Sequence, residues 1–188
     1  EQGDVDEISR SLQEIFIQGQ RCKEITHKLL SFARKTDSRI NHVDVNDMVQ
    51  ELAGFAEQKV RYDHVNIVRD LDQDLPILMA SPTDLQQVVL NLLNNAIDAI
   101  DKEDGLIILR TYTTDDKGTM IIEVEDNGMG IAPANVSRIF EPFYTTKPVG
   151  KGTGLGLSIC YGIINKMGGD ITVESERGEG ALFKVSIP

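Results

Sequence analysis

Two glycine-containing motifs in the second half of the chain constrain its fold more than any other feature. The first, Asp126-Asn127-Gly128-Met129-Gly130, follows a run of apolar, strand-favouring residues. The second, Gly152-Thr153-Gly154-Leu155-Gly156, precedes an apolar stretch that is typical of a buried helix. Glycines let a backbone come close to a ligand, and a helix start offers N–H groups to phosphate. Together they predict a nucleotide site with a base-reading acid, Asp126, at one side and phosphate donors at the other.

Neither motif fits the two familiar glycine fingerprints. A dinucleotide-binding motif needs a strand directly before its glycines, whereas residues 145–151 have the composition of a loop. A P-loop needs Ser or Thr directly after Gly-Lys, but Gly150-Lys151 is followed by Gly152. Either glycine cluster alone is equally compatible with an ordinary turn.

A third motif lies upstream, in residues 84–100. Apolar residues recur there at helical spacing, and Gln87, Asn91, Asn95 and Asp98 fall on one polar stripe. Asparagine is a poor residue for a helix interior, and a solvated face usually carries Lys and Glu. A neutral amide oxygen suits a Mg²⁺ ion that stays partly hydrated and shared with phosphates. We therefore expect Asn95 to bind magnesium with Asn91 in support; the alternative is a merely solvated face.

In this order the motifs resemble the N, G1, F and G2 boxes of bacterial sensor histidine kinases. The matching segments are 91–95, 126–130, 140–143 and 152–156, and 168–171 and 178–183 resemble the closing glycine segments. The resemblance covers about residues 40–188 and implies the ATP-binding fold shared with DNA gyrase, mismatch-repair ATPases and a heat-shock chaperone. Ala181 departs from the usual Thr, and Thr145 stands where many relatives carry Arg.

The resemblance implies ATP and Mg²⁺ as ligands. Asp126 would accept a hydrogen bond from the adenine amine, although an acid before Asn-Gly also commonly bonds its own loop. Lys147 and Lys151 would reach phosphates, although such lysines are more often only solvated. The full set of expected ATP-binding residues is Asn91, Asn95, Asp98, Asp126, Gly128, Gly130, Ile131, Tyr144, Lys147, Lys151, Gly152, Thr153, Gly154, Leu155, Gly156 and Leu157. We expect Phe140 and Phe143 to anchor the following loop in the core.

Composition narrows the class of protein. The net charge of −11, from 30 acids and 19 bases, argues against nucleic-acid or acidic-membrane binding, which need basic patches. Cys22 and Cys160 lie in apolar helical patterns and are expected to be buried thiols of a reducing, cytoplasmic compartment. No stretch approaches about 18 apolar residues, and no signal peptide is seen. The chain begins at Glu1 without Met, so we expect a fragment whose membrane anchor, if it has one, lies upstream.

Residues 5–32 carry a heptad-like apolar seam, which predicts one long bundle or coiled-coil helix. The alternative is an amphipathic helix folded back on its own domain. By the resemblance, residues 1–38 would be the second helix of a dimerisation and histidine-phosphotransfer domain, and residues 39–188 the catalytic domain.

The remaining pattern predicts a two-layer α/β sandwich with a mostly antiparallel or mixed sheet. We expect Asn46 and Asp47 to cap a helix with Met48, Leu52, Phe55 and Ala56 turned inward, and Ser81 to cap the asparagine helix. The expected helices span residues 47–60, 82–100, 133–139 and 158–167, and the expected strands span 42–45, 65–71, 77–80, 106–114, 118–125, 170–175 and 181–187.

Asn91 and the three histidines indicate which reaction to expect. Related ATPases place a water-activating glutamate at position 91, and an amide cannot take up a proton there, so hydrolysis is disfavoured. None of His27, His42 and His64 has the context of a phospho-acceptor. We therefore expect the ATP-binding part of a histidine kinase, inactive alone in autophosphorylation, with its acceptor upstream. Its expected partners are a response-regulator receiver domain and a second copy of the full-length protein. The alternatives are an anti-sigma-factor-like serine kinase and a nucleotide-binding regulatory module without transfer.

Overall fold

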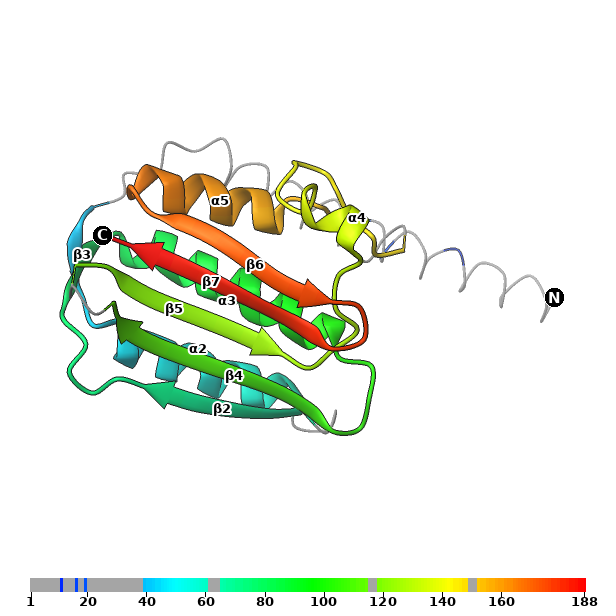
Figure 1. The fold of residues 1–188 in the computed structure, drawn as a ribbon, viewed down its shortest axis with the longest axis horizontal. Coiled ribbons are helices and arrows are strands. Elements are labelled where there is room, and N and C mark those ends of the chain that lie inside the picture. Colours follow the sequence, from blue (N-terminus) through cyan, green and yellow to red (C-terminus); the bar gives the residue numbers. More distant parts are fainter. Residues whose placement is uncertain are drawn as a thin grey trace. The chain divides into compact units, whose positions relative to one another are not determined.

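A computed structural model describes residues 39–60, 65–114, 118–148 and 152–188, together with Ser11, Phe16 and Gly19 (Figure 1). The chain divides into two compact units, and each is described by itself: Glu1–Asp37 with Thr145–Thr153, and Ser38–Tyr144 with Gly154–Pro188. The helix expected over residues 5–32 lies outside the described residues, except for the three single positions, which are helical. That helix and the domain boundary at residue 38 therefore stay predictions.

The larger unit is built on a five-stranded sheet with the order β2-β4-β5-β7-β6. Its strands are β2 (Val65–Leu71), β4 (Gly105–Thr113), β5 (Met120–Asp126), β6 (Asp170–Glu176) and β7 (Gly180–Ile187). Helices α2 (Val45–Val60), α3 (Pro82–Ala99) and α5 (Gly156–Lys166) cover one face of this sheet (Figure 1). Two short strands, β1 (Asn41–Val43) and β3 (Leu78–Ala80), pair separately, and α4 (Pro133–Val136) is a single turn.

The sheet is mixed, as expected. β2 pairs with β4 in parallel, whereas β4–β5, β5–β7 and β7–β6 are antiparallel. The two predicted hairpins are thereby confirmed, and so is the two-layer sandwich. β5 lies at the centre of the sheet, so the residue at its end has a neighbouring strand on each side.

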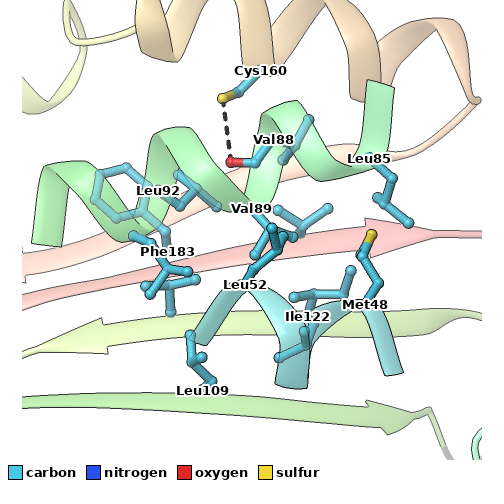
Figure 2. Packing of buried hydrophobic residues seen from close by; sticks show 14 of the residues in the cluster. Met48, Leu52, Leu85, Val88, Val89, Leu92, Leu109, Ile122, Cys160 and Phe183 are labelled. Atoms are coloured by element: carbon cyan, nitrogen blue, oxygen red, sulfur yellow. Dashed lines mark hydrogen bonds between the residues drawn. The ribbon is translucent and has the colours of Figure 1, made fainter. Parts of the chain in front are cut away.

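Helix α3 is the central element of the core. Ser81 caps it by accepting a hydrogen bond on Oγ from the Asp84 N–H at 3.3 Å, and Pro82 occupies its first turn, as predicted. Its apolar stripe packs between α2, α5 and the sheet (Figure 2). Leu85, Val88, Val89 and Leu92 are fully buried. Burying each such side chain stabilises the fold by about 1.5–3 kcal/mol.

Cys160 joins α5 to α3 within this core. Its Sγ lies 3.8 Å from the carbonyl oxygen of Val88, to which it donates (Figure 2). Burial raises the pKa of the Cys160 thiol to about 12, so the thiol stays protonated at neutral pH. The expected buried thiol is confirmed for Cys160, whereas Cys22 lies outside the described residues.

Helix α2 differs from expectation at two points. Asp44, rather than Asn46, caps it by accepting from the Asp47 N–H at 3.0 Å. The side chain of Asn46 instead bonds to the sheet. It donates to the carbonyl of Asp72, directly after β2, and accepts from Thr111 Oγ1 on β4. Phe55 is 57% exposed, so its expected inward position is wrong. The buried stripe runs through 45, 49, 52, 56 and 60, which leaves 51, 55 and 58 on the outer face.

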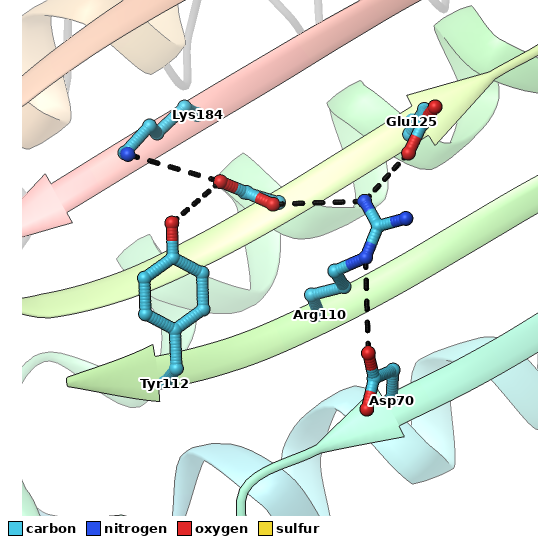
Figure 3. A network of polar contacts seen from close by, with 6 residues as sticks. Asp70, Arg110, Tyr112, Glu125 and Lys184 are labelled. Carbon is cyan, nitrogen blue, oxygen red and sulfur yellow. Dashed lines mark hydrogen bonds and ion pairs between the residues drawn. The ribbon is translucent and has the colours of Figure 1, made fainter.

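The other face of the sheet carries a polar network (Figure 3). Its centre is Glu123, which is only 7% exposed and accepts from the Tyr112 hydroxyl at 2.7 Å. The contacts continue across four strands through the charged side chains of Asp70, Arg110, Glu125 and Lys184. Partly exposed ion pairs contribute only about 0–1 kcal/mol each, so the main effect of the network is to satisfy the buried Glu123 carboxylate.

None of the helices within the described ranges combines the length and the apolar character needed to span a membrane.

Candidate functional site

Asp126 ends the central strand of the sheet. It pairs with Ile107 of β4 and Ala181 of β7, and it is only 5% exposed. Its Oδ1 accepts a hydrogen bond from the Gly128 N–H at 2.9 Å. Burial raises the pKa of the Asp126 carboxyl, while the backbone amides of Gly128 and Ala181 oppose that rise. The structure thus places the sequence-predicted acid at the end of the central strand, largely removed from water.

The glycines after Asp126 are required by the packing of the turn itself. A Cβ at Gly128 would lie 2.4 Å from the carbonyl oxygen of Ala99, at the end of α3. Gly130 has φ +63°, and a Cβ there would lie 2.0 Å from the carbonyl oxygen of Glu176. Both clashes are with backbone, which cannot move aside cheaply. The turn is therefore held between the end of α3 and the β6–β7 turn, and its contact with a base stays a prediction.

The far end of this turn is fixed by a residue that the sequence reasoning missed. The Ile131 N–H donates to Ser175 Oγ at 2.8 Å, and Ser175 Oγ–H donates to the Gly180 carbonyl at 2.6 Å. The Gly178 N–H also donates to the Met129 carbonyl at 2.9 Å. The bonds from Ile131 and to Met129 each cross more than 40 residues, so no local pattern signals them.

The asparagine stripe on α3 reaches the second glycine motif. Asn91 Nδ2 donates to the carbonyl oxygen of Gly156 at 3.4 Å, across 65 residues of sequence. Asn91 and Asn95 are half-buried, whereas Asp98 at the end of the stripe is exposed. The two motifs that predicted the site from sequence therefore meet at the start of α5.

Helix α5 begins at Gly156, two residues before the predicted start at Ser158. The preceding Gly154 has φ +66°, and its carbonyl accepts from the Phe143 N–H at 2.9 Å. Leu155 is buried at 2% exposure, so its side chain belongs to the core and only its backbone can face a ligand. Leu157 is half-buried and packs against the core. The phosphate contacts expected at this helix start stay a prediction.

The segment after α4 differs from expectation at Phe143. This residue is 67% exposed and adopts φ +66°, so the prediction that it anchors the loop in the core is wrong. Phe140 does pack against the core, with its ring centroid 5.5 Å from that of Tyr161. α4 itself ends at Val136 rather than 139.

Tyr144, an expected nucleotide neighbour, contacts a cation that was not predicted. The guanidinium carbon of Arg138 lies 4.4 Å from the Tyr144 ring centroid, and Arg138 Nε lies 3.2 Å from Glu141.

Four of the residues expected to bind ATP belong to the segment Thr145–Thr153, which falls in the same unit as Glu1–Asp37. There the Lys147 N–H donates to Thr145 Oγ1 at 3.1 Å, and a Cβ at Gly152 would lie 2.5 Å from the same oxygen. Lys151 lies outside the described residues. The phosphate contacts of Lys147, Lys151, Gly152 and Thr153 stay predictions.

Comparison with known proteins identifies this arrangement. The profile of the "Histidine kinase-, DNA gyrase B-, and HSP90-like ATPase" family matches residues 80–188. The crystallised catalytic domain of histidine kinase ThkA shares 32% identity with a TM-score of 0.70, over 79% of this chain and 95% of that one. The fold and site thus define an ATPase domain. The chain belongs to the histidine kinase-, DNA gyrase B- and HSP90-like ATPase family, and within it to the catalytic domains of sensor histidine kinases.

Curated relatives agree with that family. Sensor kinase CckA of Brucella abortus (strain 2308) is 38% identical over 181 residues, covering 89% of this chain and 19% of the relative. The two-component sensor PprA of Pseudomonas aeruginosa is 33% identical over 189 residues, covering 98% of this chain and 20% of the relative. The chain thus spans about a fifth of the length of these relatives.

Two larger solved structures are also similar. Full-length ShkA in complex with AMPPNP has a TM-score of 0.77 at 28% identity, over 90% of this chain and 35% of that one. Histidine kinase ThkA in complex with response regulator protein TrrA has a TM-score of 0.75 at 28% identity, over 91% of this chain and 48% of that one.

Proposed function

We propose that this chain binds Mg-ATP and transfers its γ-phosphoryl group to a histidine on a separate helix, for relay to an aspartate of a response regulator. The observation that carries the proposal is the buried Asp126 carboxylate at the end of the central strand, in a domain where Asn91 meets the start of α5. Likeness to ShkA, solved with AMPPNP, and to ThkA, solved with a response regulator, supports the ligand and the partner.

Asp126 is the residue that would select adenine. A carboxylate accepts from the exocyclic amine of adenine and repels the oxygen that guanine carries at the same place. Its burial makes the discrimination strong, because an unpaired polar group in a dry site is costly. Ile131, Gly128 and Gly130 would contribute backbone surface beside it.

The donor set fits a magnesium ion that the nucleotide shares. Asn95 lies on α3 one turn after Asn91, and its amide oxygen is a hard, neutral ligand. In the described part of the chain, no group of three His, Cys, Asp or Glu side chains is placed to hold a metal by itself. An ion held there by Asn95 would complete its shell with water and phosphate oxygens, and when bound it would neutralise charge on the phosphates.

The phosphate contacts would come from the backbone. The N–H groups at Gly152, Gly154 and Gly156 would point toward the phosphates at the start of α5, where the helix dipole favours negative charge. Lys147 and Lys151 would add positive charge. Catalysis would then consist mostly of positioning and charge stabilisation.

Asn91 explains why the phosphoryl group would be kept from water. An amide has no basic site at neutral pH, so it cannot activate a water molecule. In the structure its Nδ2 is also engaged with the Gly156 carbonyl at 3.4 Å. Of the histidines, His42 is exposed on β1, and His27 and His64 lie outside the described residues. We propose an acceptor histidine on a partner helix of the dimeric full-length kinase.

The test is phosphotransfer from radiolabelled ATP. The chain as it stands should neither label itself nor hydrolyse ATP above a trace rate. The same chain extended upstream by a helix carrying the relatives' acceptor histidine should acquire acid-labile, base-stable phosphate on that histidine. Substituting the added histidine by Gln should abolish the label. Acid-stable phosphate on serine, or label on His27 of the unextended chain, would overturn the proposal.

A further inference from the structure

Asn127 lies between the adenine-reading acid and the first glycine of its turn, and the function proposed above gives it no role. Its side chain points away from the turn and bonds another part of the chain. Oδ1 accepts from the Leu106 N–H at 2.8 Å, and Nδ2 donates to the Asp104 carbonyl oxygen at 2.9 Å. The Asn127 N–H adds a third bond, to the Leu106 carbonyl at 3.1 Å.

These bonds reach the segment that connects α3 to β4. α3 ends at Ala99, and β4 begins at Gly105. The same segment is tied to the turn a second time, because the Met129 N–H donates to the Ala99 carbonyl at 2.9 Å. The turn after Asp126 is therefore fastened to both ends of the α3–β4 connection.

The geometry of Asp126 depends on that fastening. Asp126 Oδ1 accepts from the Gly128 N–H, so the carboxylate orientation follows the backbone on the far side of Asn127. Gly128 in turn packs on the Ala99 carbonyl so closely that a Cβ would not fit. Without the Asn127 side chain, only backbone bonds from Asn127 and Met129 and the packing of Gly128 would hold the turn on this side. The Gly128 N–H would then be placed less firmly relative to α3, and the carboxylate with it.

We propose that Asn127 is a positioning residue of the nucleotide site, which sets base selectivity by holding the Asp126 carboxylate at a fixed place relative to α3. The inference rests on the proposed adenine role of Asp126. It couples the residue that reads the base to the helix that carries Asn91 and Asn95, so that base and metal would be presented at a constant separation.

The amide group itself is required, not only its size. One end of the side chain must accept from an N–H and the other must donate to a carbonyl, which an asparagine does and an aspartate does not. The connection already carries Asp101, Glu103 and Asp104. Asn127→Asp would therefore lose the bond to the Asp104 carbonyl and add negative charge next to Asp126.

The test compares ATP with purine riboside triphosphate, which lacks the 6-amino group that Asp126 would bind. Dissociation constants are measured by calorimetry with Mg²⁺ for wild type, Asn127→Ala, Asn127→Asp and Asp126→Ala, with melting temperatures for each. The control is Asn165→Ala, because Asn165 is exposed on α5. Wild type and control should prefer ATP by about tenfold, the effect of one hydrogen bond to a charged group.

Both Asn127 variants should lose most of that preference through weaker ATP binding, while affinity for purine riboside triphosphate changes less than twofold. A structural role alone would weaken both ligands equally. Asn127→Asp keeps the bond from the Leu106 N–H, so it serves as the folded variant if Asn127→Ala does not fold. Folded Asn127→Asp with the wild-type preference would overturn the positioning role. If Asp126→Ala also keeps that preference, the adenine role of Asp126 fails with it; if Asp126→Ala loses it, only the positioning role fails.

Discussion

At the Asp126 end of the site, short hydrogen bonds hold the turn to the segments on both of its sides, whereas at the Gly156 end the side-chain bond that reaches α3 is long. Around Asp126, hydrogen bonds of 2.8–3.1 Å reach the α3–β4 connection on one side and the β6–β7 hairpin on the other. Around Gly156, Asn91 on α3 bonds the Gly156 carbonyl at 3.4 Å, and the Phe143 N–H bonds the Gly154 carbonyl at 2.9 Å.

This difference between the two ends fits the two tasks proposed for the site, which are selection of the base and transfer of the phosphoryl group. A base-reading acid must hold its position before the ligand arrives, because discrimination between bases depends on the cost of leaving polar groups unpaired. The phosphate end has a different task, since the ligand itself supplies charge and metal ligands there. The backbone at Gly156, where an added Cβ would meet only the Asn91 side chain, has room to adjust to the nucleotide and to an acceptor. The preceding Gly154 is packed closely on the backbone of Phe143, which is exposed and in a left-handed conformation.

The sharpest way to break this comparison is to add one methyl group at each end. Gly130→Ala places a Cβ 2.0 Å from the Glu176 carbonyl at φ +63°, and should lower the free energy of unfolding by about 3 kcal/mol or more. Gly156→Ala meets only the Asn91 side chain, at 3.7 Å, and should change it by less than about 1 kcal/mol. Urea unfolding measures both. Similar losses in the two variants would mean that the two ends are equally constrained.

The second prediction concerns the ligand at the base end. Asp126→Ala should weaken ATP binding roughly 10- to 100-fold, because a hydrogen bond to a charged group is lost from a dry site. Glu125→Gln is the matched control, since Glu125 lies next in the chain but pairs with Arg110 in the network on the opposite face of the sheet. Calorimetry with Mg-ATP and Mg-GTP makes the measurement. Equal affinities of wild type for the two nucleotides would remove Asp126 from the role of base reader.

The third prediction concerns the metal. Asn95→Ala should bring the ATP affinity measured with Mg²⁺ down to that measured with EDTA, while the fold is kept because Ala favours helix. Asn94→Ala is the matched control, since its Nδ2 donates within the helix to the Leu90 carbonyl at 2.8 Å. A variant that binds Mg-ATP as tightly as wild type would show that the α3 stripe is a solvated face.

Much of the fold could be predicted because its elements are long and periodic. The α3 stripe, its Ser81 cap and the two hairpins are local patterns, and the structure confirms them. Phe55 on α2 shows where this prediction fails. Its neighbours 52 and 56 are buried, but the most deeply buried positions of the helix include 49, 53 and 60, and position 55 lies outside that stripe. Periodicity locates a stripe only to within about one residue, and a large apolar side chain at its edge is easily assigned to the wrong face.

The residues of the candidate site could be picked out from the sequence where a side chain stands out by its type, and not where backbone groups hold the turn. Asp126, Asn91 and the glycines stand out by residue type. The carbonyls of Ala99 and Glu176, which make Gly128 and Gly130 necessary, leave no trace in the sequence. Asn127 and Ser175 were likewise missed, because their partners are backbone groups 21 and 44 residues away. Such partners become visible only when the strand register is known.

The smallest expected effect is on the pH dependence of the free energy of unfolding, because the burial of Asp126 destabilises the ionised carboxylate that would bind the base. Burial raises the pKa of its carboxyl in the folded state, so the folded chain holds that proton more tightly than the unfolded chain does. Stability must then fall as pH rises from the unfolded value of about 4 through the raised folded value, and the cost persists above it. Asp126→Asn removes this dependence. The melting temperature of the variant should therefore rise relative to that of wild type as pH increases from about 4, and the difference should become constant above the raised pKa, although ATP binding is weakened. Thermal unfolding of both proteins across this pH range makes the measurement. If wild type instead gains stability relative to the variant as pH rises, the hydrogen bonds from Gly128 and Ala181 outweigh the desolvation of the Asp126 carboxylate. The ionised carboxylate would then stabilise the fold rather than destabilise it.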